Sequence, residues 1–165
     1  MRVVLFVRGG FALAEPADGD VERLRAESDG AFDVDPDERS APPPVNVDRA
    51  VVVDVATGEL LGDVSWHQVQ YGRTHACGAW NMGIMLLPAA RGRGVGSAAI
   101  RMVVEHLFAT TDLDRVEAST DVDNLPAQRA LAAAGMRREG VIRGAQLRGG
   151  VRRDLVAYGV LRSDR

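Results

Sequence analysis

The feature that most constrains this chain of 165 residues is the segment LLPAARGRGVGS at positions 86–97. An apolar run that ends at a proline is followed by three glycines, which lead directly into apolar residues at helical spacing. Glycines let consecutive N–H groups turn toward one anion, and a helix N-terminus adds partial positive charge. The segment therefore predicts a strand, a turn and a helix around a site that fits a pyrophosphate. A glycine-rich turn without a ligand has the same pattern.

Length, charge and cysteine content limit the class of protein. With 46% hydrophobic residues, the chain can bury one substantial core and is too short for two ordinary domains, so we expect a single domain over residues 1–165. A formal net charge of -3 gives no basic footprint for nucleic acid. No stretch reaches the roughly 20 apolar residues of a membrane span. A lone cysteine, Cys77, allows no internal disulfide and favours a reducing, cytoplasmic setting.

Patterns along the chain predict the order of the elements. Residues 1–14 are expected to form a first strand, residues 20–28 a short helix, and residues 29–44, with their triple proline, a loop or flap. From residue 50 two β-rich runs form a hairpin, and residues 79–87 suit a strand buried on both faces.

The second half predicts a helix at 95–109, a strand at 115–120 and a short helix that begins after Asn124 and is closed by Gly135. Two final strands, at 136–143 and 152–161, flank a glycine turn. We expect an α/β (α+β) fold with a mixed, mostly antiparallel sheet. The parallel pair is the strand at 80–87 with the strand at 115–120, connected through the helix.

These motifs together resemble the GNAT superfamily of acyl-CoA-dependent N-acetyltransferases. Its pattern Q/R-x-x-G-x-G/A is met by Arg91, Gly94 and Gly96. Asn124, a short helix and then Gly135-Met136 are similar to the family's N-x-x-A/S…G-F block, with methionine in place of phenylalanine. The closing runs RREGVIRG and DLVAY look like the branch of ribosomal-protein N-terminal acetyltransferases. The resemblance covers residues 50–162, and it implies a splayed central strand pair flanked by helices.

The resemblance also implies a cosubstrate, acetyl-CoA, and an acceptor, a primary amine on a small molecule or a peptide N-terminus. The main chain of the strand before the turn would bind the pantetheine arm, the amides of the turn would hold the pyrophosphate, and Asn124 would hydrogen-bond the pantetheine. A strand N–H near the end of that strand can polarise the thioester carbonyl. The cofactor-binding residues are then Ile84, Met85, Leu86, Leu87, Arg91, Gly92, Arg93, Gly94, Val95, Gly96, Ser97 and Asn124.

The catalytic residues depart from the family's habits. Many relatives carry Glu where this chain has Asn81 and Tyr where it has Leu131, and the ribosomal branch has Ser where it has Ala127. An amine must lose a proton before it attacks a thioester at neutral pH, so a base or a bound water is still required. The remaining candidates are His67, Ser119 and Asp121. His67 is preferred as the base, because its strand is expected beside that of Asn81, and a purely structural role is open for each.

Residues 1–49 are the divergent region that, in GNAT relatives, walls the acceptor pocket. Positions 15–48 hold eleven acidic side chains against three arginines, which favours a cationic acceptor unless the loop is merely solvated. The three histidines and the cysteine show no metal-ligand spacing, so no metal is expected. A homodimer is left open.

Two other functions remain as alternatives. A catalytically silent CoA-binding or interaction module of the same fold is compatible with the altered catalytic positions. A dinucleotide-binding domain is suggested by the match of residues 94–99 to G-x-G-x-x-G/A, although no further βαβ units follow.

Overall fold

The computed structural model describes residues 1–39 and 46–165. Within these residues, eight strands form one sheet, three α-helices pack on it, and three short 3-10 turns join the elements. The strands are β1 (Val4–Arg8), β2 (Phe11–Ala14), β3 (Asp48–Asp54), β4 (Leu60–Gln70), β5 (Gly78–Leu86), β6 (Arg115–Asp121), β7 (Arg137–Arg148) and β8 (Val151–Leu161). The helices are α1 (Asp20–Glu27), α2 (Val95–Thr110) and α3 (Leu125–Ala133).

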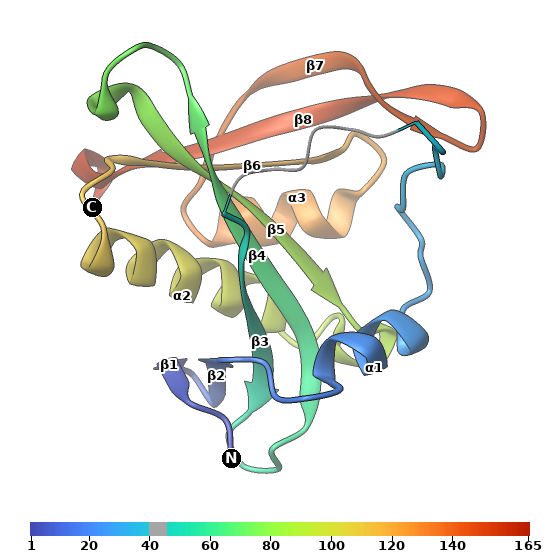
Figure 1. The fold of residues 1–165 in the computed structure, drawn as a ribbon, viewed down its shortest axis with the longest axis vertical. Helices are drawn as coiled ribbons and strands as arrows, with labels where there is room; N and C mark the ends of the chain where they lie inside the picture. The colour runs from blue at the N-terminus through green and yellow to red at the C-terminus, as the bar shows by residue number, and fades with distance from the viewer. Residues whose placement is uncertain (40–45) are drawn as a thin grey trace.

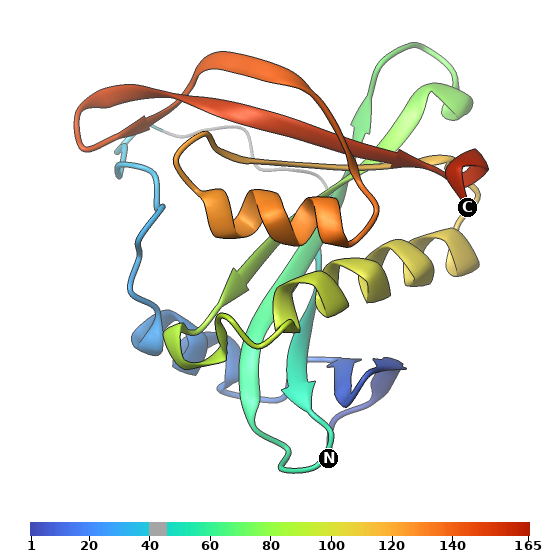
Figure 2. The ribbon, with the colours of Figure 1, turned by 180° about the vertical axis from the view of Figure 1, so that it is seen from behind.

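The order of strands in the sheet is β1-β2-β3-β4-β5-β6-β8-β7. Neighbours pair antiparallel except β5 and β6, which are parallel and are connected through α2. Helices α2 and α3 cover one face of the sheet and α1 lies on the other, as the two opposite views show (Figures 1 and 2). The mixed sheet with one parallel pair is confirmed. A doubly wound parallel sheet, which the dinucleotide-binding alternative requires, is not what these strands form.

Alternation along the strands divides the apolar residues between two clusters. The larger one lies under α2 and includes Met82 and Val116 from the strands together with the apolar stripe of the helix, of which Ile100 and Val103 are almost fully buried. The smaller cluster lies under α1 and is built around Leu24. Because successive side chains of a strand point to opposite faces, the residues between the core positions of β4, β5 and β6 face the α1 side.

Two predictions about the strands were wrong in detail. Residues 1–14 form two short antiparallel strands rather than one, because Gly9 and Gly10, both with positive φ, make a tight turn between them. Strand β5 is not buried on both faces, since Gly83 is exposed and Asn81 is half-buried. The predicted loop at 29–44 is irregular as far as residue 39, and its positions 40–44 lie outside the described residues.

Candidate active site

Strands β5 and β6 separate soon after they meet. They pair only at Trp80 with Val116 and at Asn81 with Glu117, although β5 continues to Leu86. On its other edge β5 stays paired with β4 along its whole length. Beyond Asn81, the edge of β5 toward β6 therefore has no partner strand (Figure 1). Unpaired strand amides and carbonyls are strong hydrogen-bonding groups, so a long polar ligand can bind between the two strands.

The turn that follows β5 presents backbone donors. Gly92 and Gly94 have φ of 72° and 78°, and no heavy atom lies within 4 Å of the position that a Cβ would take at either residue. Gly94 is the N-cap of α2, where no side chain accepts from the first turn of the helix. Because the first N–H groups of a helix lack intrahelical acceptors, they are directed at a ligand position. This open cradle fits a pyrophosphate.

Both arginines of the turn already have carboxylate partners. Arg91 donates to Asp29 with Nη1 and Nη2, at 2.6 and 2.8 Å, and to the Leu86 carbonyl with Nε and Nη2, at 3.2 and 3.1 Å. The hydrogen bonds from Arg91 to Asp29 lower the pKa of Asp29 to about 2. The guanidinium of Arg93 lies 3.7 Å from Asp54. The anion site therefore depends first on backbone N–H groups, and direct contacts of the arginines with a phosphate stay a prediction.

Asn124 lies across the gap from β5, at the start of α3. Its side-chain oxygen accepts from the Ala127 amide at 3.3 Å, which makes it the N-cap of this helix. Its side-chain NH₂ has no hydrogen-bond partner among the residues that the structure describes. The half-buried side chain thus caps the helix and keeps two donors for a ligand.

A polar row crosses the sheet where the two strands separate. His67 on β4 is directly opposite Asn81 on β5, which in turn pairs with Glu117 on β6. Adjacent strands are about 4.8 Å apart, so the three residues follow one another at that spacing. Their side chains face away from α2, since the sequence neighbours Trp80 and Val116 pack against the core on the α2 side. His67 thus lies beside the Asn81 strand, as the sequence predicts.

Glu117 is the member of this row that the sequence analysis missed. Its Oε1 accepts from Asn81 Nδ2 at 3.2 Å, and its Oε2 accepts from the Tyr71 hydroxyl at 2.7 Å and from Arg115 Nε and Nη2 at 3.1 and 3.0 Å. The hydrogen bond to Glu117 raises the pKa of Tyr71. Arg115 also binds Glu139, at 2.8 and 2.6 Å, and these carboxylates raise the pKa of the guanidinium. Alternation with buried Val116 predicts the face of Glu117, but only the register of β5 and β6 reveals its partner.

The other two catalytic candidates lie farther along β6. Ser119 is exposed, and Asp121, four residues beyond Glu117, is about 13 Å from the row at the usual rise of a strand. The side chain of Asp121 is buried, its Oδ2 lies 2.8 Å from Arg148 Nη1 as an ion pair, and its Oδ1 accepts from the Asp123 amide. The structure therefore does not bring Asp121 to His67, and its catalytic assignment stays a prediction.

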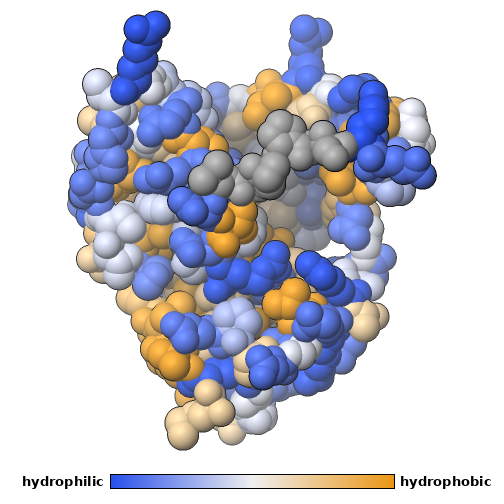
Figure 3. All heavy atoms as spheres, viewed as in Figure 1, coloured by the Kyte–Doolittle hydropathy of each residue, from blue (hydrophilic) through white to orange (hydrophobic). Residues whose placement is uncertain are grey.

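The segment after α1 forms one wall of the space in front of the separated strands. Asp35 accepts from the amides of Gly149 and Gly150, at 2.6 and 2.8 Å, and its own amide donates to the Leu147 carbonyl. Residues 28–39 therefore run from α1 to the β7–β8 hairpin (Figure 1). The space-filling view shows a hollow on this face, right of centre, where the ribbon has α3 behind the gap between β5 and this segment (Figure 3).

The acidic residues of this segment are largely engaged by partners. Asp29 binds Arg91, Asp35 caps the hairpin turn, and Asp37 binds Arg39 at 2.6 Å. Elsewhere in the acidic region, Asp20 binds Arg2 at 2.7 Å. The field that the wall directs at a cationic acceptor is weaker than the count of carboxylates alone suggests.

Comparison with known proteins identifies the family. The model of the acetyltransferase (GNAT) domain family matches residues 17–137, which is most of the chain. The chain belongs to the GNAT family. Among curated proteins, the probable N-acetyltransferase YjcK of Bacillus subtilis (strain 168) is 32% identical over 105 residues, which cover 64% of this chain and 56% of that protein. The chain spans little more than half the length of the curated relatives that it matches.

Two solved structures share the GNAT fold with this chain. A ribosomal-protein-S5-alanine acetyltransferase from Vibrio fischeri is 18% identical, with a TM-score of 0.78 and 98% of both chains covered. A spermidine N-acetyltransferase from Vibrio cholerae, solved in complex with CoA and spermine, is also 18% identical, with a TM-score of 0.77 over 95% of this chain and 98% of that one. At 18% sequence identity, these two similarities establish a shared fold only.

Within residues 1–39 and 46–165, no group of three or more His, Cys, Asp or Glu side chains is arranged to hold a metal ion. None of the helices in those residues has both the length and the apolar character to cross a bilayer.

Proposed function

We propose that this GNAT protein is an N-acetyltransferase that transfers an acetyl group from acetyl-CoA to a primary amine. The observation that carries the proposal is the separation of β5 from β6 after two residue pairs, directly before a glycine turn with open backbone donors. The strands supply hydrogen bonds for an extended arm, and the turn supplies them for a pyrophosphate. The unpaired edge of β5 leads directly into the glycine turn, so a single ligand with an extended arm and a pyrophosphate can bind to both.

The cosubstrate would be held by residues on both sides of the gap. The main chain of residues 84–87 faces the pantetheine arm, the amides of residues 92–97 face the pyrophosphate, and the free NH₂ of Asn124 reaches the arm from α3. Bound acetyl-CoA supplies a thioester, which is an activated acyl group. An N–H of β5 near Met85 or Leu86 polarises the acyl carbonyl as in an oxyanion hole.

The polar row is proposed to handle the acceptor. His67 has no hydrogen-bond partner among the described residues, so its imidazole is free to take the proton that the amine loses, directly or through water. Glu117 already accepts four hydrogen bonds, and it therefore suits positioning rather than proton transfer. With its NH₂ given to Glu117, Asn81 keeps its amide oxygen to accept from the amine.

The class of acceptor is the open part of this proposal. The two solved relatives with similar folds are named for different acceptors, a ribosomal protein and a polyamine, so the fold alone does not select one. A small amine and a peptide N-terminus both fit, and a cationic one is favoured by the excess of acids in residues 15–48. A cytoplasmic location, suggested by the lone Cys77, and a homodimer are proposed with it.

A thiol-release assay tests the activity. The protein is incubated with acetyl-CoA and a panel of polyamines, amino sugars and peptides with free N-termini, and free CoA thiol is measured. Release that depends on one class of amine is the expected result and names the acceptor. Binding of CoA without release over the whole panel would favour the silent module instead, which Leu131, buried in the core where many relatives carry Tyr, also allows.

A further inference from the structure

A second cavity lies on the opposite side of the sheet from the polar row. It has a volume of about 290 Å³ and is lined by residues of β1, β3, β4 and β5, by Glu15 and by the C-terminal end of α2. Trp66 and Trp80 line it, and each is the direct neighbour in sequence of a residue of the row, His67 or Asn81. Since neighbours on a strand point to opposite faces, Trp66 and Trp80 point away from the acceptor side.

The aromatic wall of this cavity is held by contacts within the protein. Trp66 is 6% exposed, and its ring meets that of His106 edge-on, with centroids 5.8 Å apart. Trp80 donates its indole N–H to the Thr111 hydroxyl at 3.0 Å, and that hydroxyl donates to the Leu107 carbonyl. The polar group of Trp80 is thus satisfied within the protein. The indoles therefore contribute mainly ring atoms to the wall of the cavity.

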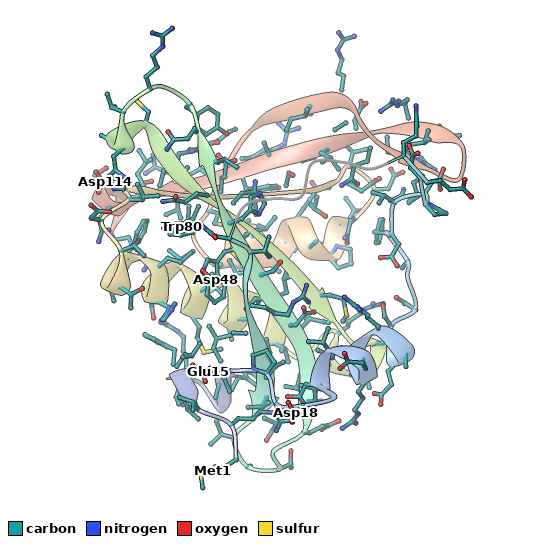
Figure 4. The ribbon with its side chains drawn as sticks, in the orientation of Figure 1. Met1, Glu15, Asp18, Asp48, Trp80 and Asp114 are labelled. Carbon is teal, nitrogen blue, oxygen red and sulfur yellow. The ribbon has the colours of Figure 1, made fainter. Side chains whose placement is uncertain are left out.

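The rim of the cavity carries two carboxylates, Asp48 and Glu15. Asp48 pairs directly with Trp66 in the register of β3 and β4, and Glu15 follows β2. Neither carboxylate forms a hydrogen bond or an ion pair with any described residue, 40–45 being outside that set. Arg49 also lines the cavity, but its guanidinium is held by Asp63 on β4. Figure 4 shows Trp80, Asp48 and Glu15 in succession beside α2.

We propose that this cavity binds a small organic ammonium ion. Indole faces attract an ammonium group through the ring quadrupole, and the attraction is stronger where the site is desolvated. The two carboxylates add attraction for positive charge, and they repel an anion. The volume lies at the lower end of small-molecule sites, which limits the ligand to a few carbons around the charged nitrogen. The site is distinct from the acceptor side of the proposed transferase.

The chain's only two tryptophans both line the cavity, so intrinsic fluorescence reports on its occupancy. The probes are choline and 3,3-dimethylbutan-1-ol, which have the same shape and differ in the charge of one atom. Choline should change the emission in a saturable way. The neutral alcohol should bind at least about tenfold more weakly, which corresponds to the loss of one cation–π contact. Equal affinity for the two probes, or no saturable change with choline, would overturn the proposal.

Variants locate the binding. Asp48→Asn and Glu15→Gln should each weaken choline binding by about fivefold, since each removes one charge from the rim and both residues are exposed. Asp18→Asn removes an exposed carboxylate that does not line the cavity (Figure 4), and Glu117→Gln changes the acceptor row; both should bind choline as the parent does. Unchanged affinity in Asp48→Asn and Glu15→Gln rejects this site. Loss in Glu117→Gln instead would mean that choline binds on the acceptor side, so the outcome separates the two sites.

Discussion

At the scale of single residues, Gly94 has properties that few positions combine. It has a left-handed φ of 78°, it begins α2, and open space surrounds the position of its missing Cβ. Gly58, in the β3–β4 hairpin, shares the left-handed φ of 71° and the open surroundings but lies away from the turn. The two glycines form a matched pair that separates backbone strain from loss of a binding site.

The first prediction concerns this pair. Gly94→Asp places a carboxylate where the pyrophosphate is proposed to bind, and it should lower CoA affinity by about a hundredfold, with a smaller loss for the uncharged Gly94→Asn. Isothermal titration with CoA measures both. Gly58→Asn controls for strain, and should match Gly94→Asn in the shift of Tm while binding CoA normally. Parental affinity in a folded Gly94→Asp protein would reject the pyrophosphate site.

His67 is the subject of the second prediction. His67→Ala should lower kcat with the best amine by roughly a hundredfold, the usual size of a general-base contribution, and should leave the KM for acetyl-CoA nearly unchanged. Steady-state kinetics provide the measurement. Gln68→Ala, at the next position of β4 and pointing to the other face, is the control. If His67→Ala kept near-normal turnover, the amine would have to arrive deprotonated from bulk water.

The residues of the row were only partly accessible from the sequence. His67 could be placed beside Asn81, because consecutive β runs in a hairpin pattern pair antiparallel. Glu117 could not be linked to either residue, since its position depends on how far a parallel pair extends before separating, and this is decided by tertiary packing rather than by local pattern. The sequence also could not reveal that the arginines of the turn would bind Asp29 and Asp54.

At the scale of elements, a buried ion pair connects β6 to the β7–β8 hairpin. Asp121 is almost fully buried and Arg148 is half-buried, and the guanidinium also stacks on the ring of Phe32, 4.9 Å away. The contact therefore joins three segments that are far apart in sequence. A charge in such a site is costly to leave unpaired.

The third prediction follows from this contact. Asp121→Ala should destabilise the protein by about 3 to 5 kcal/mol, because it leaves Arg148 without its partner. The double variant Asp121→Ala/Arg148→Met should recover part of that loss, since it removes both charges. Urea unfolding of the two single variants and the double variant gives the coupling. Strict additivity would contradict the assignment of an energetic ion pair.

Elements with strong local signals were predicted well, and those defined by turns were not. The strand, glycine turn and helix at 78–110 and the helix capped by Asn124 follow from apolar spacing and capping residues. The prediction of a single first strand was wrong because Gly9 and Gly10 form a hairpin turn within an otherwise apolar run. The docking of residues 28–39 on the hairpin depends on Asp35 meeting two amides more than 110 residues away, which no local pattern encodes.

At the scale of the whole molecule, paired carboxylates connect distant parts of the chain. Asp20 binds Arg2, Asp29 binds Arg91, and Glu139 binds Arg115. In each case the hydrogen bond from the guanidinium is the main cause that lowers the pKa of the carboxylate, to about 2 for Asp29. Each folded-state value is thus below that of the unfolded chain, which for Asp is 3.8.

The fourth prediction is a loss of stability in acid. The contribution of these carboxylates is complete above the unfolded pKa, and it is lost as pH falls through the folded values, so the free energy of unfolding should decrease between about pH 4 and pH 2. Urea midpoints at pH 7, 4 and 3 measure the effect. Asp20→Asn should be less stable at pH 7 and lose less than the parent on acidification. A midpoint that is the same at pH 3 as at pH 7 would contradict the assignment.

The register of β4, β5 and β6 has a consequence for how this protein can diversify. The polar row and the tryptophan-lined cavity are built from alternate residues of the same strands, so substitutions can alter either surface without disturbing the other. A deletion of one residue within β5 has the opposite effect, because it exchanges the two faces and would turn Trp80 or Met82 toward the row in place of Asn81. Changes of length are therefore expected in connections such as residues 71–77, whereas the strands themselves should diverge by replacement.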